Sequence, residues 1–247
     1  MSGYLIDITP AVSPALAVWP GDTPPTREVL LDLRRGEPLT LSTLHATVHL
    51  GAHADAPSHY GIEGAAIDER SLDYYIGPCQ VVRIHAARGT RIKPQAFDRA
   101  RQRHGGLAPR ILIATGTFPD PTVFNQDFAA LAPELLDWLH ERGVRLVGVD
   151  TPSVDLFDSK DLPAHKRFLV HDMAILEGLL LRDVPEGFYE LIALPLKLVG
   201  FDASPVRAVL RAAKRQGSGF GSDGERAGES GAKKTTNAPH ATDAAAV

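Results

Sequence analysis

Three histidines and an aspartate lie within one short stretch of this chain, and their chemistry indicates a metal site. The stretch reads His49-Leu-Gly-Ala-His53-Ala-Asp55-Ala-Pro-Ser-His59. Imidazole nitrogens and carboxylate oxygens are the usual protein ligands of zinc and its neighbours. One histidine alone is most often an ordinary core or surface residue, but this density favours a hydrolytic metal centre. His45, just before the cluster, gains nothing from the spacing and is interpreted as structural.

The spacing limits the backbone that could bring these side chains to one ion. A helix would place His49 and His53 on one face, but Gly51 lies inside it and Pro57 would end it. A straight strand, rising roughly 3.3 Å per residue, would separate the two histidines by roughly 13 Å. With Zn–N bonds of about 2.0–2.1 Å, both rings could barely reach one ion at that distance. We therefore expect a strand that ends in a tight loop bent at Gly51, because glycine permits such a bend.

The composition of the whole chain excludes several functional classes. The chain has 247 residues, 44% hydrophobic and 23% charged, with a formal net charge of -4, which are ordinary globular values. A slightly acidic chain lacks the basic surface that nucleic-acid-binding proteins present. The single cysteine, Cys79, excludes an internal disulfide and a cysteine-rich zinc site. We interpret Cys79 as a buried thiol at a strand edge and expect any metal to bind His, Asp and Glu.

No targeting or membrane-spanning segment is recognisable in the sequence. Asp7 and Pro10 occupy the region where a signal peptide would need a basic start and an apolar run. No stretch approaches the roughly 20 apolar residues of a membrane helix. We expect a cytoplasmic protein that binds neither a membrane nor nucleic acid.

The composition changes near Lys214, where Gly, Ser, Ala and Thr replace the apolar residues. Residues 214–247 are predicted to be a disordered tail, because they cannot bury enough surface to offset their ordering entropy. His240 is therefore excluded from any site, and residues 1–213 are predicted to form one domain.

Short β-branched runs and helical periodicities alternate only in the middle of that domain. The expected strands are Leu5–Ile8, Ala46–Leu50, Gln80–His85, Arg110–Ala114, Arg145–Val149 and Tyr189–Pro195. The expected helices are Pro94–His104, Pro133–Arg142 and Ser204–Ala213, the last from a serine N-cap followed by proline. This pattern predicts a mixed α/β domain and not a doubly wound sheet.

The histidine-rich string resembles the signature of the cyclase-type metal-dependent hydrolases, His-x-Gly-Thr-His-x-Asp-x-Pro-x-His. It departs at Ala52, where the family has a threonine that is not a ligand. Within this family the chain is most similar to the bacterial kynurenine formamidases, over about residues 4–211. The further matching blocks are Asp7–Pro10, Val18–Pro24, Gly148–Asp155, His165, Ile175–Leu179, Leu191–Lys197 and Asp202–Arg207.

The resemblance implies a single mixed α/β domain of the cyclase-like, swivelling β/β/α type with two metal ions, zinc or alternatively manganese. The metal ligands that it implies are His49, His53, Asp55, His165 and Glu177. Asp55 would bridge the ions, His59 would be the general acid/base, and Trp19 would line an aromatic substrate pocket. The resemblance also implies a homodimer.

The implied activity is that of an arylformamidase of tryptophan degradation. Such an enzyme hydrolyses N-formyl-L-kynurenine to L-kynurenine and formate. A metal lowers the pKa of a bound water from 15.7 to about 7 and so supplies hydroxide. His59 would carry the proton to the leaving arylamine, because an ordinary histidine pKa near 6.5 suits this task.

The residues by themselves leave alternatives open at the downstream half of the site. Their pattern selects neither His165 over His171 nor Glu177 over Asp172 or Asp155. By pattern alone, His165 is interpreted as an exposed loop residue. Glu177 follows an apolar Ala-Ile-Leu run, so its carboxylate is expected to be buried and to need a partner.

Three other functions compete with the formamidase hypothesis. A related hydrolase could share the site and act on another amide, a lactam or a cyclic ester, as isatin hydrolases do. A metal-binding protein without activity would leave His59 with no role. A serine hydrolase would need a Gly-x-Ser-x-Gly elbow, and this chain has none.

Overall fold

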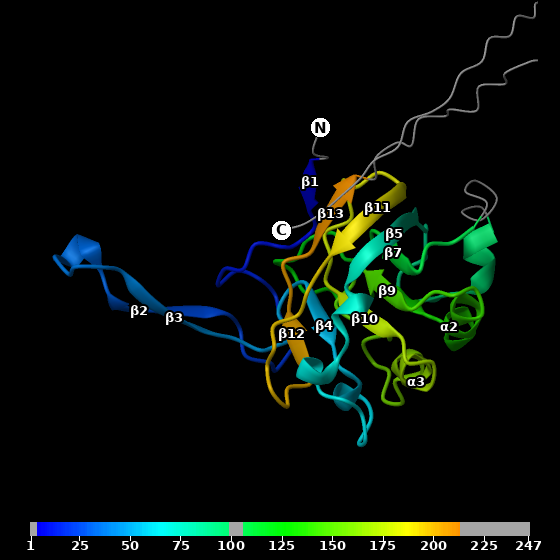
Figure 1. Cartoon of the computed structure of the whole chain (residues 1–247), viewed down its shortest axis with the longest axis horizontal. Coiled ribbons are helices and arrows are strands. Elements are labelled where there is room, and N and C mark those ends of the chain that lie inside the picture. Colours follow the sequence, from blue (N-terminus) through cyan, green and yellow to red (C-terminus); the bar gives the residue numbers. More distant parts are fainter. Residues whose placement is uncertain (1–3, 99–105, 213–247) are drawn as a thin grey trace, which may run out of the picture. The chain divides into compact units, whose positions relative to one another are not determined.

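One nine-stranded sheet organises the part of the chain that the computed structural model describes, residues 4–98 and 106–212 (Figure 1). In spatial order its strands are β1 (Leu5–Asp7), β13 (Val209–Ala212), β11 (Gly187–Ile192), β5 (Ile76–Arg83), β7 (Arg110–Ala114), β9 (Leu146–Val149), β10 (Ala174–Glu177), β4 (His53–Asp55) and β12 (Ala203–Pro205). The central strands β5, β7, β9 and β10 pair in parallel, and every other pair is antiparallel. The domain is therefore a mixed α/β fold, as the sequence predicts.

The central strands are buried on both faces, which explains their almost continuous apolar sequences. In β7, Ile111 and Ile113 face a core that also contains Phe168, while Leu112 faces the opposite core with Leu210. This alternation follows from the two-residue period of a strand. The sheet thus separates two hydrophobic cores.

Two helices, α2 (Pro133–His140) and α3 (Pro163–Val170), pack against each other over one of these cores (Figure 1). Both begin with a proline in the first turn, where its missing N–H costs no hydrogen bond. Leu135, Leu136 and Leu139 of α2 are buried. The predicted helix Pro133–Arg142 is therefore confirmed with an earlier end, whereas α3 was not expected.

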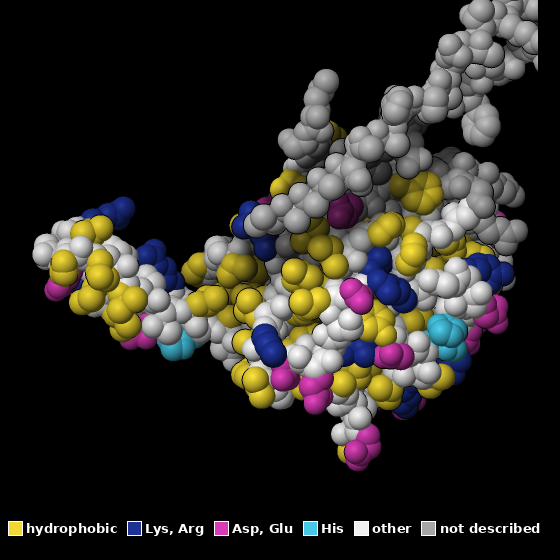
Figure 2. Space-filling model, viewed as in Figure 1, with side chains coloured by type: hydrophobic (Ala, Val, Ile, Leu, Met, Phe, Trp, Pro, Cys, Tyr) yellow, Lys and Arg dark blue, Asp and Glu magenta, His cyan; other side chains and the backbone are white. Residues whose placement is uncertain are grey.

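Smaller elements complete the described part of the chain. Strands β2 (Thr26–Leu31) and β3 (Leu41–His45) form a hairpin that extends away from the large sheet (Figure 1), and β6 (Arg91–Ile92) pairs with β8 (Ala130–Leu131). Short 3-10 helices span Leu33–Arg35, Pro57–His59, Ile67–Glu69, Leu72–Tyr74 and Pro94–Phe97. Apolar side chains gather on the exposed hairpin (Figure 2), among them those of Leu30, Leu33 and Leu44. The hairpin contributes no residue to either core.

Two of the predicted elements are wrong. The strand expected at Ala46–Leu50 is an irregular segment, because the strand ends earlier, at His45, and the next one begins only at His53. The helix expected from Ser204 is replaced by β12 and β13. The serine-proline signal is local, and the pairing of Ala203–Pro205 with β4 overrides it; proline is tolerated there because β12 is an edge strand.

Other sequence predictions are met to different degrees. The strands expected near Leu5, Gln80, Arg110, Arg145 and Tyr189 are present as β1, β5, β7, β9 and β11. Cys79 is fully buried in β5, and burial raises the pKa of its thiol to about 12. The expected helix Pro94–His104 begins as a 3-10 turn, and its remainder, like the predicted tail 214–247, extends outside the described residues. None of the described helices is long and apolar enough to span a bilayer.

Candidate metal centre

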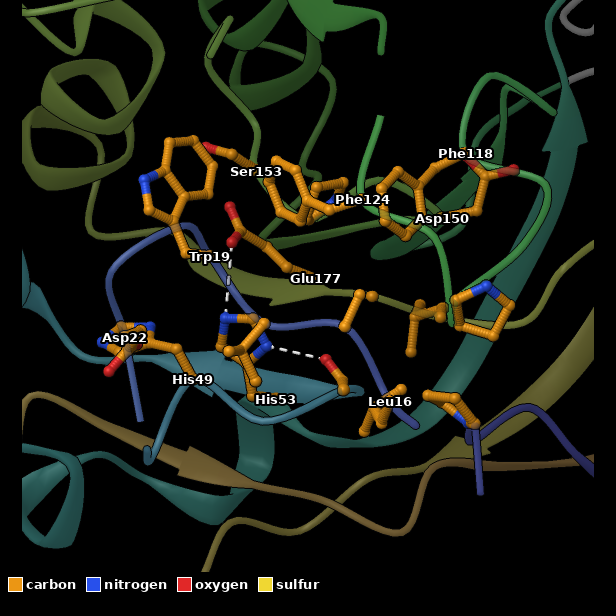
Figure 3. Close-up of a pocket in the computed structure, with 18 of the residues that line it drawn as sticks. Leu16, Trp19, Asp22, His49, His53, Phe118, Phe124, Asp150, Ser153 and Glu177 are labelled. Carbon is orange, nitrogen blue, oxygen red and sulfur yellow. Dashed lines mark hydrogen bonds and ion pairs between the residues drawn. The ribbon is translucent and has the colours of Figure 1, made fainter. Parts of the chain in front are cut away.

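Strand pairing joins the two halves of the candidate site. β4 carries His53 and Asp55, and its neighbour β10 ends at Glu177, which lies opposite His53 in the antiparallel register. His165 lies in the first turn of α3, and the 3-10 helix Pro57–His59 follows β4. The side chains of His49, His53 and Glu177 converge at the floor of a cavity (Figure 3). Residues more than a hundred positions apart are therefore neighbours.

The bend before β4 depends on two glycines. Gly51 has a φ of +55°, and its carbonyl oxygen accepts a 2.9 Å hydrogen bond from His53 Nδ1. Gly178 also has a positive φ, of +66°, and a Cβ at that position would lie 2.1 Å from the Gly51 oxygen. The expected bend at Gly51 is thus present. The sequence predicts a strand that ends at this bend, whereas in the structure strand β4 begins after it.

Asp55 is the centre of the cluster. Its Oδ1 lies 3.1 Å from His49 Nδ1 and 3.5 Å from His53 Nε2, while its Oδ2 lies 3.5 Å from His165 Nε2. The carboxylate therefore presents one oxygen to the signature histidines and the other to the histidine of α3.

Glu177 spans the same two groups. Its Oε2 lies 3.4 Å from His53 Nε2 and its Oε1 lies 3.8 Å from His165 Nε2. The backbone N–H of Val154 donates a 2.7 Å hydrogen bond to Oε1 and so fixes the carboxylate. The sequence predicts that a buried Glu177 carboxylate needs a partner, and the histidines of this cluster are that partner.

Each of the three inner histidines has its outer nitrogen occupied by an oxygen acceptor. His53 Nδ1–H donates to the Gly51 carbonyl, and His165 Nδ1–H donates to Asp155 Oδ2 at 2.9 Å. His49 Nε2–H donates to Asp202 Oδ2 at 3.0 Å. The inner nitrogens are left to face Asp55, and an oxygen acceptor on the second ring nitrogen is typical of metal-binding histidines.

The electrostatics of the cluster favour cations. Burial alone would lower the pKa of His49 and His165, but the surrounding carboxylates outweigh burial and raise them to about 9 and about 10. Burial would raise the pKa of Asp55, yet the adjoining histidines hold it well below its usual range. Without a metal, protons on the histidines balance the buried carboxylates.

An unsatisfied group in the middle of the cluster tests whether a metal fits. Asp55 is buried, and neither of its carboxylate oxygens has a partner with hydrogen-bond geometry among the described residues. A buried carboxylate without hydrogen bonds is costly unless a cation coordinates it. Ligand atoms of His53, Asp55 and Glu177 lie within 4.8 Å of one another, as do those of His49, Asp55 and His59. The residues present therefore fit a divalent metal.

The cluster opens into a cavity of about 490 Å³ with aromatic walls. Trp19, Phe118 and Phe124 line it (Figure 3), and His59 is a further lining residue. The indole of Trp19 contacts Phe124 edge-on at 5.5 Å between ring centroids. Among the described lining residues there is no Lys or Arg, whereas Asp22 is acidic. Such a cavity suits a flat aromatic molecule.

In the structure every sequence-predicted site residue lies at this cavity or in its floor. Two of the alternative ligands considered from the sequence lie away from it. His171 and Asp172 line a different hollow, while Asp155 lies behind His165 and contacts it. The interpretation of His165 as an exposed loop residue is wrong, because it lies in α3 and is 3% exposed. Pattern missed Asp202, whose only signal is its place in the Asp-Ala-Ser-Pro block, and the aromatic residues Phe118 and Phe124, which have none.

Comparison with known proteins identifies the family of the chain. Residues 6–156 match the family described as "Putative cyclase", so the chain belongs to the cyclase family. A "potential metal-dependent hydrolase with cyclase activity" has a similar structure, with a TM-score of 0.72 and 27% identity over 84% of this chain and 96% of the other. A predicted metal-dependent hydrolase from Bacillus stearothermophilus gives 0.71 and 28%, over 85% and 98%.

Isatin hydrolase A from Labrenzia aggregata, bound to benzyl benzoate, shares the fold as well. Its TM-score is 0.74 at 24% identity, over 85% of this chain and 93% of that one. The chain is thus a cyclase-family protein that shares its fold with proteins described as potential or predicted metal-dependent hydrolases.

Proposed function

We propose that this chain is a metal-dependent amidohydrolase that converts N-formyl-L-kynurenine and water to L-kynurenine and formate. The observation that carries the proposal is Asp55, a buried carboxylate with no hydrogen-bond partner among the described residues. It lies 3.1 Å from His49 and 3.5 Å from His53, two residues that line an aromatic cavity. Metal-dependent hydrolases with this fold support the hydrolytic chemistry. The sequence resemblance to kynurenine formamidases supports the choice of substrate.

The inner nitrogens define which residues would hold the metal. His49, His53 and Asp55 would hold one ion, and Asp55 and His165 would hold a second. Glu177 reaches toward both places. Divalent ions held by these residues would supply hydroxide at neutral pH and would stabilise negative charge on the carbonyl oxygen.

The position of His59 suits a general acid and base. Its ring centroid lies 4.3 Å from that of His49 and 6.0 Å from that of His165, and it lines the cavity. It would take the proton from the attacking water and return it to the leaving nitrogen. Trp19, Phe118 and Phe124 would hold the aryl ring against the floor of the cavity and exclude water.

A second candidate, hydrolysis of a cyclic aromatic amide such as isatin, is favoured by the charge of the cavity. N-formylkynurenine carries an α-carboxylate, for which the described lining residues offer no Lys or Arg. Its ammonium group has Asp22 as the complementary charge, and neutral isatin needs neither. The fold is shared with isatin hydrolases, so the two substrates must be compared directly.

The decisive experiment is a chelate-and-restore assay on the full chain. The purified protein is assayed on N-formylkynurenine and on isatin as isolated, after chelation, and after addition of Zn²⁺ or Mn²⁺, with elemental analysis at each stage. We expect formylkynurenine turnover that chelation abolishes and metal restores, at two ions per subunit. Turnover of isatin but not of N-formylkynurenine would favour the second candidate function. Turnover that resists the chelator would refute both metal-dependent functions. Zinc as the natural metal and a homodimer stay predictions from the resemblance, and a cytoplasmic location stays a prediction from the sequence.

A further inference from the structure

We propose that Asp202 is a positioning residue that holds His59 with its proton on Nδ1 and so leaves the Nε2 lone pair free to accept a proton. The inference deepens the proposed function, on which its catalytic consequence rests. The structural part, the tautomer of His59, can be tested without any substrate.

The first support is the placement of the Asp202 carboxylate. Its Oδ2 lies 3.2 Å from His59 Nδ1 and 3.0 Å from His49 Nε2. An ionised carboxylate only accepts hydrogen bonds, so both rings must donate an N–H to this oxygen. One oxygen therefore sets the tautomer of two histidines at once. His49 is directed with Nδ1 toward Asp55, and His59 is left with Nε2 as its free nitrogen.

The second support is the backbone around Asp202, which fixes the carboxylate to the segment that carries His59. The carbonyl oxygen of Asp202 accepts a 2.8 Å hydrogen bond from the N–H of Ala56, immediately before the 3-10 helix Pro57–His59. The preceding carbonyl, of Phe201, accepts a 2.9 Å hydrogen bond from Ile67 N–H, beyond that helix. Main-chain hydrogen bonds, which do not involve either side chain, therefore fix the position of Asp202 relative to the segment that carries His59.

The third support is that no other described residue offers His59 Nδ1 a hydrogen bond. The only side-chain hydrogen bond of His59 in the described part of the chain is the one to Asp202. Its ring also has aromatic contacts with His49, His165 and Tyr60, and its side chain is 34% exposed. Without Asp202 the imidazole could rotate or change tautomer, and a base with the wrong tautomer cannot accept the proton.

The substitution that tests the inference is Asp202→Asn, which keeps the shape and the backbone hydrogen bonds but removes the negative charge. Its matched control is Asp183→Asn, which alters a carboxylate that is 93% exposed and whose one ion pair within the described residues is a 3.8 Å contact with Arg182. The first readout is ¹⁵N NMR of the zinc-loaded full chain labelled at histidine, with the His59 signals identified by their loss in His59→Gln. We expect a proton on His59 Nδ1 in the native protein and in Asp183→Asn, and its partial or complete loss in Asp202→Asn. A native His59 without a proton on Nδ1, or a signal unchanged in Asp202→Asn, would overturn the inference.

The second readout is a double-mutant cycle in saturating metal. Asp202→Asn should lower kcat by about tenfold to a hundredfold with little change in KM, less than for a fully buried triad aspartate because this side chain is half exposed. In a His59→Ala background the same substitution should cost little more, since Asp202 would act through the missing ring. Equal losses in both backgrounds would mean that Asp202 acts on the metal site or the fold alone. If no formylkynurenine is turned over by the native protein, the proposed function fails while the NMR experiment still decides the tautomer.

Discussion

A histidine can bind a metal or carry a proton through either ring nitrogen. In this protein the hydrogen bond made by the outer nitrogen determines which nitrogen faces the cluster. Gly51, Asp155 and Asp202 each occupy one nitrogen of a different ring. The histidines themselves are visible in the sequence as a dense cluster. Their outer partners are not, because a backbone carbonyl has no sequence signal and Asp202 is distant along the chain. Sequence alone can therefore nominate ligands but cannot say which nitrogen each one uses.

At this scale the first prediction concerns His59. Replacement by alanine should lower kcat by about 10²- to 10⁴-fold, the usual contribution of general acid–base catalysis, while elemental analysis finds the native metal content. His53→Ala is the comparison, because it removes a buried side chain next to Asp55 and should reduce metal content as well as rate. Loss of metal from His59→Ala would instead identify His59 as a metal ligand. Ligand atoms of His59, His49 and Asp55 lie close enough together for that role.

The second prediction concerns Trp19, whose ring contacts Phe157 at 5.0 Å and Phe124 at 5.5 Å between centroids. Trp19→Phe shortens this aromatic wall, and aromatic pairs contribute about 0.5–1.5 kcal/mol beyond area burial. We expect the KM for an aryl formamide to rise about 2- to 10-fold with a smaller change in kcat. Trp138→Phe is the control, since Trp138 packs on Phe97 and Arg142 and does not line the cavity. Equal effects of the two substitutions would argue against a pocket role for Trp19.

Among the elements, those with strong local signals were predictable and those made by distant pairing were not. Strand β7 has a continuous apolar run and helix α2 has apolar residues at helical spacing, and these local patterns specify them. Strands β4 and β12 have three residues each and exist because they pair with each other, while β4 also pairs with β10. Pairing with β4 is also the reason why a strand replaces the helix expected at Ser204. The site lies in these short elements, so its position in the fold could not be predicted from local sequence.

The third prediction tests the contact that joins two of these short elements. Gly178→Ala would place a Cβ 2.1 Å from the Gly51 carbonyl oxygen, which also holds the His53 ring. Gly143→Ala is a matched control, because Gly143 also has a positive φ but nothing within 4 Å of the added atom. The control should cost about 1–2 kcal/mol from the left-handed backbone alone. Gly178→Ala should cost clearly more in urea denaturation and should reduce metal content, and equal costs would refute the role of this contact.

For the molecule as a whole, the site is a concentration of buried charge that links segments far apart in sequence. Asp55 and Glu177 lie on neighbouring strands, and His165 belongs to a helix that packs over the sheet. The metal-free protein must hold protons on the histidines to balance these carboxylates, whereas a divalent ion would balance them directly. Metal binding and stability should therefore be linked through pH.

The fourth prediction follows from the sign of that linkage. In the metal-free protein the pKa of His49 is raised to about 9 and that of His165 to about 10, above an unfolded value near 6.5. The folded state thus binds more protons than the unfolded state, so the stabilisation is complete below about pH 6.5 and is lost as pH rises through about 9 to 10. The metal-bound protein has no such protons to lose, and groups remote from the site titrate alike in both forms.

Thermal unfolding at pH 6.5, 7.5, 8.5 and 9 should therefore show a difference in Tm between metal-bound and chelated protein that widens with pH. Since about 1 kcal/mol shifts Tm by roughly 2–4 °C at this chain length, a widening of several degrees is expected. His165→Asn, which removes one raised pKa, should flatten the pH dependence of the chelated form. Parallel Tm curves for the metal-bound and chelated protein would show that the metal does not replace protons at these histidines, and the metal centre would have to be sought elsewhere in the chain.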